Sequence, residues 1–104
     1  MVEQWARAWS DRDVAGYLDH YADDFMPDKG LLRTAWESGR RKRLAASHSI
    51  LVTIRDLRIE PAGEGRVIAR FAQDYLADAY RESGTPKMLV LARQSAGWRI
   101  IAEL

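Results

Sequence analysis

Two polar side chains interrupt the apolar face of a strand predicted over residues 66–80. Alternate residues of a strand share a face, and the face in question carries Val67, Ala69, Phe71, Gln73, Tyr75 and Ala77. If this face is concave, the Gln73 amide and the Tyr75 hydroxyl project into a mostly apolar cavity, as in many small-molecule sites. The alternative is that both groups pair with buried backbone groups.

Charged side chains are expected near the same cavity. Lys87 shares a face with Leu89 and Leu91 on a strand predicted over residues 87–93. Glu103 is expected on the face opposite Ile100 and Ala102 in a last strand over residues 98–104. We interpret Lys87 and Glu103 as charges at the rim of a pocket, with full solvation as the alternative.

Arg40-Arg41-Lys42-Arg43 is the densest charge run. On a helix, Arg41 and Lys42 point away from the apolar stripe, whereas Arg40 and Arg43 lean toward the sheet. Cations near a helix C-terminus interact favourably with its free carbonyls. The other interpretation is that Arg40, and less so Arg43, grips a carboxylate or phosphate at the pocket mouth.

Acidic residues gather in a second cluster, Asp23, Asp24 and Asp28, with His20 nearby. They surround a predicted helix end and a Pro-Gly loop, where aspartate favours turns. Two adjacent acids lack the convergent geometry that metals require, so we expect neither a metal site nor a cofactor. His48 has no recognisable acid or nucleophile partner, and we assign no catalytic residue.

Composition restricts the class of protein. The chain has 104 residues, 47% of them hydrophobic, which favours one folded domain over residues 1–104. Sixteen Lys and Arg oppose fifteen Asp and Glu, which argues against bulk attraction to nucleic acid. The absence of cysteine excludes disulfides and thiol chemistry. No apolar run approaches the roughly 20 residues that a membrane span requires.

Apolar spacing predicts helices first and strands afterwards. Trp5 and Trp9 mark one face of a first helix. A second helix is predicted by the spacing of Val14, Tyr17, Leu18, Tyr21 and Phe25, and a third runs over residues 31–44 with Trp36 on its inner side.

From Ser49 onward the period changes to two, which indicates strands. The alternation shifts phase between Ile54 and Leu57, which predicts a β-bulge near Arg55-Asp56. Turns are predicted at residues 61–65, 83–86 and 95–97. The chain enters a helix without an N-cap and ends within a strand pattern, so we expect a module excised from a longer protein.

The chain resembles the nuclear transport factor 2-like superfamily, also called SnoaL-like or cystatin-like. The segments that carry the resemblance are Trp9-Ser10-Asp11-Arg12-Asp13-Val14, Tyr17-Leu18, residues 21–25, Trp36-Glu37 with the arginines that follow, residues 71–75, Lys87 with Leu89 and Leu91, and Gly97-Trp98-Arg99-Ile100 with Glu103. More narrowly, it resembles the C-terminal module of bacterial L,D-transpeptidase-type cell-shape proteins.

This resemblance implies an α+β cone, in which N-terminal helices pack in the concave face of a curved antiparallel sheet around a cavity. It also implies a homodimer through the outer face of the sheet and a place in the bacterial periplasm or cell envelope. It does not imply an activity. Enzymes of the superfamily use Asp, Tyr or Arg in the cavity, whereas Asp74 and Asp78 are expected on the opposite strand face here.

Three functions remain open. The first is a non-catalytic binding or accessory module whose pocket holds a small anionic or peptidoglycan-derived ligand. Its expected ligand-binding residues are Tyr21, Trp36, Arg40, Gln73, Tyr75, Lys87 and Glu103. The second is a small isomerase or hydrolase with Tyr75 as acid and Glu103 as the carboxylate. The third is a structural dimerisation module, which is favoured if side chains such as Trp36 and Phe71 fill the cavity.

Overall fold

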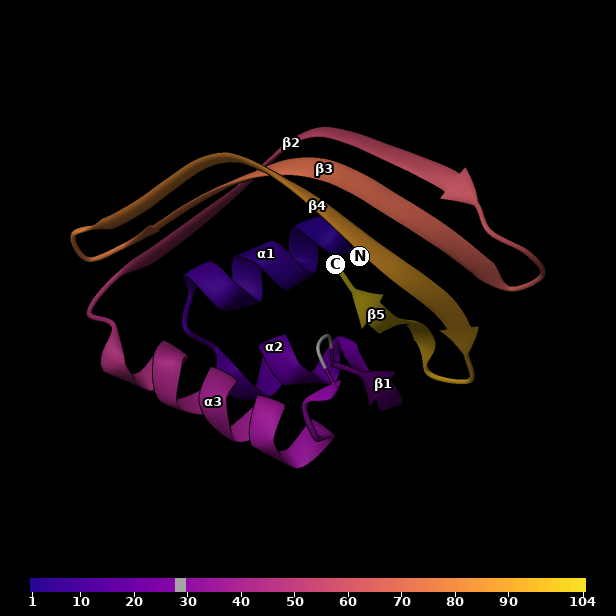
Figure 1. Ribbon diagram of the computed structural model, residues 1–104, viewed down its shortest axis with the longest axis horizontal. Coiled ribbons are helices and arrows are strands. Elements are labelled where there is room, and N and C mark those ends of the chain that lie inside the picture. Colours follow the sequence, from indigo (N-terminus) through magenta and orange to yellow (C-terminus); the bar gives the residue numbers. More distant parts are fainter. Residues whose placement is uncertain (28–29) are drawn as a thin grey trace.

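The computed structural model describes residues 1–27 and 30–104, with helices packed under a curved sheet (Figure 1). The elements in chain order are α1 (Val2–Ser10), α2 (Val14–Asp19), β1 (Tyr21–Met26), α3 (Arg33–Ala46), β2 (Ile50–Pro61), β3 (Arg66–Ala77), β4 (Tyr80–Gln94) and β5 (Gly97–Glu103). Within the described residues, no helix is both long and apolar enough to span a membrane. The α+β architecture predicted from the periodicity is confirmed.

The strands form a five-stranded sheet in the order β1-β5-β4-β3-β2. β2, β3, β4 and β5 pair antiparallel with their neighbours, whereas β1 pairs parallel with β5, so the sheet is mixed rather than fully antiparallel. The sheet arches over α1, while α2 and α3 lie below (Figure 1).

Helix α1 buries its tryptophan face under the sheet, as its spacing predicts. Trp5 is fully buried and Trp9 is 5% exposed. Trp5 packs edge-on against Phe71, and Trp9 packs against Tyr75 with ring centroids 5.1 Å apart. Aromatic pairs in these tilted and edge-on arrangements are favourable beyond the area that they bury. The sheet face that carries Gln73 and Tyr75 is therefore the one that packs on the helices.

The predicted β-bulge in β2 is confirmed. The register with β3 shifts between Arg55 and Arg58, and Asp56 has a φ of 56°. The Arg55 guanidinium donates two hydrogen bonds of 2.9 Å to Asp74 across the strands. The extra residue bends β2 and lets the sheet curve around α1.

The helix predicted through Tyr21 and Phe25 is wrong. Helix α2 ends at Asp19, and residues 21–26 form the edge strand β1. The Ile100 amide donates to the His20 carbonyl at 2.8 Å, which starts the parallel pairing with β5. β1 is irregular, because Tyr21 and Met26 pair with Ile100 and Ala102. Residues four apart share a face in a strand as well as in a helix, so the spacing of Tyr21 and Phe25 is compatible with both structures.

The turn predicted at residues 83–86 is also wrong. β3 ends at Ala77, and β4 already begins at Tyr80. Asp78 makes the turn with a φ of 54°, and its carboxylate accepts hydrogen bonds from the amides of His48 and Ser49. The Ser83-Gly84 segment instead lies in a bulge of β4, where the Gly84 amide donates to Asp74 at 2.8 Å. The β3–β4 hairpin is consequently longer than expected.

Candidate functional site

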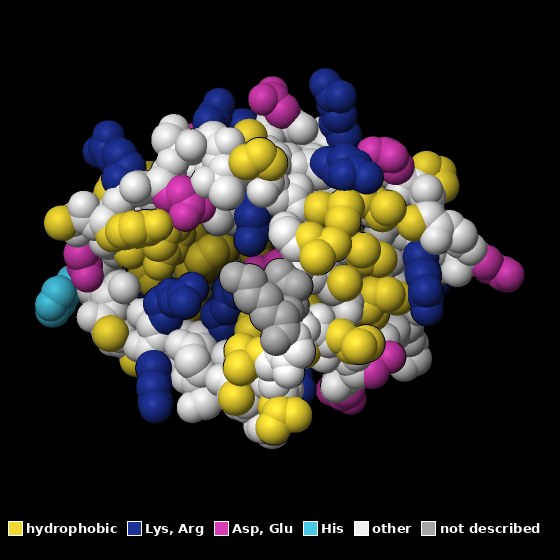
Figure 2. Space-filling model, viewed as in Figure 1, with side chains coloured by type: hydrophobic (Ala, Val, Ile, Leu, Met, Phe, Trp, Pro, Cys, Tyr) yellow, Lys and Arg dark blue, Asp and Glu magenta, His cyan; other side chains and the backbone are white. Residues whose placement is uncertain are grey.

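A cavity of about 490 Å³ lies between α3, α1 and the inner face of the sheet. In Figure 2 it appears as a hollow left of centre, with hydrophobic walls and Lys or Arg side chains at its edge. Its lining residues are Trp9, Arg40, Arg43, Ser47, Gln73, Tyr75, Ala77, Tyr80, Glu82, Lys87 and Glu103. They come from α1, α3, β3, β4, β5 and the segment after α3.

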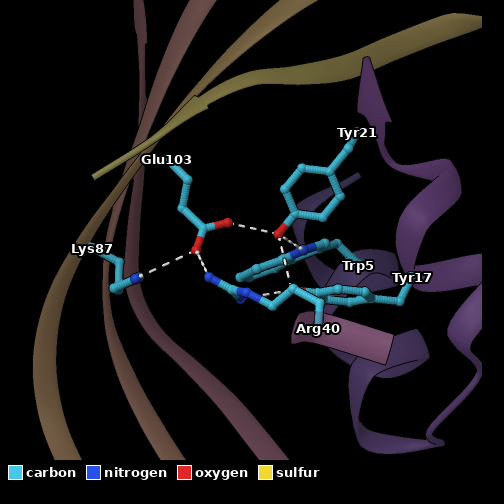
Figure 3. A network of polar contacts seen from close by, with 6 residues as sticks. All are labelled: Trp5, Tyr17, Tyr21, Arg40, Lys87 and Glu103. Carbon is cyan, nitrogen blue, oxygen red and sulfur yellow. Dashed lines mark hydrogen bonds and ion pairs between the residues drawn. The ribbon is translucent and has the colours of Figure 1, made fainter. Parts of the chain in front are cut away.

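Three charged side chains meet at the inner end of this cavity (Figure 3). Glu103 Oε2 lies 3.2 Å from Arg40 Nη2 and 3.6 Å from Lys87 Nζ. The Glu103 side chain is 7% exposed, whereas those of Arg40 and Lys87 are 18% and 21% exposed. We call Arg40, Lys87 and Glu103 the ion triad. It is partly screened from water, so its charges interact more strongly than those of a surface pair.

The position of Glu103 corrects the expectation from simple alternation. Leu89 pairs with Glu103, whereas Leu91 pairs with Ile100, so β5 holds one extra residue at Ile101. This bulge turns both Ile100 and Glu103 toward the interior, although alternation places them on opposite faces. Glu103 is therefore a buried carboxylate and not a rim charge.

A hydrogen-bonded chain supports the other oxygen of Glu103 (Figure 3). The Tyr21 hydroxyl donates to Glu103 Oε1 at 2.6 Å, and Trp5 Nε1 donates to the Tyr21 hydroxyl at 3.1 Å. Arg40 Nη1 donates to the Tyr17 hydroxyl at 2.8 Å, and the hydroxyls of Tyr17 and Tyr21 lie 3.1 Å apart. Both oxygens of the carboxylate are thus held by protein donors, which fixes its orientation.

Burial keeps the two tyrosines of this chain protonated. Desolvation raises the pKa of Tyr17 to about 12, although the Arg40 guanidinium opposes the rise. Desolvation, together with the neighbouring Tyr17 and the Glu103 carboxylate, raises the pKa of Tyr21 well above its usual value. The pKa of Arg40 also lies above its usual value, because Tyr17 and Glu103 outweigh its desolvation. Around neutral pH the network holds neutral hydroxyls and a charged guanidinium.

Two neutral polar groups belong to other residues of the cavity lining. Trp9 Nε1 and Gln73 Oε1 are buried without a hydrogen-bond partner in the described part of the chain. Burial also raises the pKa of the Tyr75 hydroxyl, with Arg43 and Arg40 opposing the shift. The Trp9 indole lies near this hydroxyl and slightly favours its ionised form, but without hydrogen-bond geometry.

The structure brings five of the seven expected ligand-binding residues to this cavity: Arg40, Gln73, Tyr75, Lys87 and Glu103. Tyr21 is 3% exposed and reaches the site only through its hydrogen bond to Glu103. Trp36 packs on Tyr21 at 4.5 Å between ring centroids and lines a neighbouring hollow of about 260 Å³, which shares the ion triad.

Sequence reasoning missed Trp9, Tyr80 and Glu82 as lining residues. The spacing of Trp5 and Trp9 indicates a buried face but not which indole reaches a cavity. The sequence pattern predicts that Tyr80 ends a strand and assigns Glu82 to no element, whereas both lie in β4, where the Tyr80 hydroxyl donates to Glu82 at 3.2 Å.

The Tyr75 hydroxyl and Glu103 do not form a hydrogen-bonded acid–base pair in the described residues. In the described residues no carboxylate is hydrogen-bonded to the Tyr75 hydroxyl, and Glu103 is already occupied by Tyr21, Arg40 and Lys87. Trp36 and Phe71 are both buried but do not fill the cavity. The cavity lining therefore combines the ion triad with two neutral polar atoms that have no hydrogen-bond partner in the described residues.

The acidic cluster does not form a recognisable ion site in the described residues. Asp23 and Asp24 are exposed on β1, and Asp28 lies outside the described residues. His20 Nδ1 lies 2.7 Å from the Gly16 carbonyl. Across residues 1–27 and 30–104, no three potential ligands gather around a common point.

A curved, unclosed sheet that packs on helices and leaves a lateral cavity is the architecture of the NTF2-like, or cystatin-like, class. The chain belongs to the Cds6 C-terminal NTF2-like domain family, whose sequence profile matches residues 1–104. A comparison with curated proteins found no match.

Solved structures agree on the fold. Bd1075 from Bdellovibrio bacteriovorus superposes with a TM-score of 0.86 at 22% identity, over 99% of this chain and 36% of that chain. A variant of the helical cell shape determining protein Pgp2 from Campylobacter jejuni superposes with a TM-score of 0.88 at 22% identity, over 99% of this chain and 37% of that chain. A protein of unknown function with a cystatin-like fold from Nostoc punctiforme superposes with a TM-score of 0.74 at 13% identity, over 98% of this chain and 81% of that chain. The chain therefore spans little more than a third of Bd1075 and Pgp2.

Proposed function

We propose that this chain is a non-catalytic binding or accessory module of a bacterial envelope protein. Its cavity binds a small anionic ligand, for which a peptidoglycan fragment is the leading candidate. The proposed contacts are Arg40, Gln73, Tyr75 and Lys87, while Glu103, Tyr21 and Trp36 hold the two cations in place.

The charge distribution of the cavity carries this proposal. The lining contains three cations, Arg40, Arg43 and Lys87, but only two carboxylates, Glu82 and Glu103. Arg40 and Lys87 share a single carboxylate oxygen, so each retains hydrogen-bond donors for a second anion. An anionic ligand would complete the pairing of these groups in a partly dry site, where charge-assisted hydrogen bonds are strong.

The envelope location rests on similarity. The chain belongs to the Cds6 C-terminal NTF2-like family, and one of the structures with the same fold is a helical cell shape determining protein. Cell shape in bacteria depends on the peptidoglycan layer, which makes its soluble fragments reasonable first ligands. A module of 104 residues beside other domains would then serve to place them on that layer.

A titration with a muramyl tripeptide, followed by ¹⁵N–¹H NMR, tests the proposal. We expect the backbone amides of Gln73, Tyr75 and Lys87 to shift at millimolar ligand. Lys87→Met removes one cation of the triad and should weaken binding about tenfold, the value of one charge-assisted hydrogen bond.

The matched control is Lys42→Met, because Lys42 is an exposed cation of α3 outside the cavity. It should leave the titration unchanged, and the spectrum of each variant reports whether it is folded. If no cavity resonance moves, or if both lysine variants bind as the unchanged protein does, the proposed function is wrong.

We also propose that two copies associate through the outer face of the sheet. Ile68, Met88 and Val90 lie there on neighbouring strands and are only partly buried, because none of the described helices or strands covers them. Sedimentation velocity is expected to show a dimer that dissociates when Val90 is replaced by Lys. A monomer at all concentrations would contradict this association without bearing on the cavity.

A further inference from the structure

The cavity contains two neutral groups that the ion triad does not use. Trp9 Nε1 is a donor and Gln73 Oε1 is an acceptor, and neither has a partner in the described residues. Trp9 is 5% exposed and Gln73 is 3% exposed, so bulk water has little access to hydrogen-bond with these two groups. Both residues line the same cavity, from α1 and β3 respectively.

Unpaired groups of this kind are uncommon in protein interiors. A buried donor or acceptor without a partner destabilises the folded state, and the great majority of such groups are paired. Core packing alone would be served better by an apolar side chain at either position. Their presence on a cavity wall therefore points to a ligand group that supplies one acceptor and one donor.

A secondary amide is a neutral group that offers this pair from two separate atoms. Its carbonyl accepts from the indole N–H, and its N–H donates to the Gln73 carboxamide oxygen. The terminal torsion of glutamine is soft, so the carboxamide can turn toward the cavity at little cost. Burial raises the pKa of Tyr75, so its hydroxyl stays protonated near neutral pH. The Tyr75 ring packs on the Trp9 indole, and its hydroxyl can contact the same ligand.

The spacing relates this amide to the ion triad. Lys87 pairs with Phe71 and Thr85 pairs with Gln73, so Gln73 stands one inward-facing position away from Lys87 along the sheet. Two residues of strand correspond to about 6.6 Å. A ligand that carries an anionic group and an amide a few bonds apart can reach both places at once.

We propose that Trp9 and Gln73 recognise an amide group of the ligand, and that the site selects amide-bearing carboxylates over plain carboxylates. This inference rests on the proposed function, because it assumes that the carboxylate binds near Arg40 and Lys87. It adds a specificity that charge alone does not provide.

The test compares two probes that differ only at the amide nitrogen. One is γ-acetamidobutyrate, and the other is its ketone analogue, in which a methylene group replaces the N–H. Titration by NMR should show that the amide binds about tenfold more tightly, because the analogue leaves Gln73 Oε1 unpaired. Gln73→Met, which is close in shape and lacks the carboxamide, should abolish the preference.

Trp9→Phe removes the indole N–H and should weaken the binding of both probes, since both have a carbonyl. Gln94→Met and Trp98→Phe are matched controls outside this cavity, and they should leave the affinities and the preference unchanged. The dispersion of each spectrum shows whether the variant is folded.

The outcomes separate the two proposals. If both probes bind equally to the unchanged protein, the amide recognition is wrong while anion binding stands, and ordered water would account for the two groups. If the amide preference survives in Gln73→Met, the assignment to Gln73 is wrong. If neither probe binds, the proposed function fails and the amide recognition fails with it.

Discussion

Replacement of Glu103 by alanine is expected to lower the free energy of unfolding by about 3 kcal/mol, the cost of breaking a buried ion pair by removing one partner. The variant leaves Arg40 and Lys87 beside each other without a counterion. It also removes the acceptor for the Tyr21 hydroxyl. Urea denaturation followed by tryptophan fluorescence measures the loss.

Two comparisons assign this loss to the unpaired charges. Glu37→Ala removes a carboxylate that pairs with Arg33 and Arg41 on the surface of α3, and should cost less than about 1 kcal/mol. The triple variant Arg40→Met, Lys87→Met, Glu103→Leu should recover most of the stability, because it removes all three charges. A Glu103→Ala variant as stable as Glu37→Ala would contradict the structure of the triad.

Alkaline pH is expected to destabilise the fold through Tyr17. Its pKa is about 12 in the folded protein, against a usual value of 10.0. Because the folded state holds the proton more tightly, the stabilisation is fully present below pH 10 and is lost as the pH rises toward 12. Two pKa units correspond to about 3 kcal/mol, and the raised pKa of Tyr21 acts in the same direction.

The measurement is the free energy of unfolding between neutral pH and the alkaline range, for the unchanged protein and for Tyr17→Phe. The variant should show a shallower decline above pH 10, although it loses the hydrogen bond from Arg40. Tyr80→Phe is the control, since Tyr80 is 58% exposed. An identical slope in all three proteins would argue against a buried, protonated Tyr17.

Much of the fold is readable from the sequence because the signals are local. The two tryptophans of α1 lie four residues apart, and that spacing suffices to place both on one helix face. The phase shift after Ile54 predicts the bulge in β2, because an inserted residue reverses the alternation. The inner face of β3 follows from strict alternation: five of its six predicted residues are buried, and Val67 at the start of the strand is half-buried.

The errors arise where distant segments decide the local structure. Tyr21 and Phe25 have helical spacing, but the edge of β5 offers unpaired backbone groups that an extended segment satisfies. The residue composition of the β3–β4 connection predicts a turn at residues 83–86. The turn occurs instead at Asp78, whose carboxylate is held by the amides that follow α3.

The order of helices and strands, the polar groups on the inner face of β3 and the cations of α3 can be predicted from the residues alone, because each depends on a local period of two or of 3.6 residues. The inward orientation of Glu103 cannot, since the bulge at Ile101 arises from the pairing of β5 with β4. The meeting of Trp9 and Gln73 in one cavity also depends on the three-dimensional fold, because α1 and β3 are far apart in sequence and come together only where the sheet curves around α1.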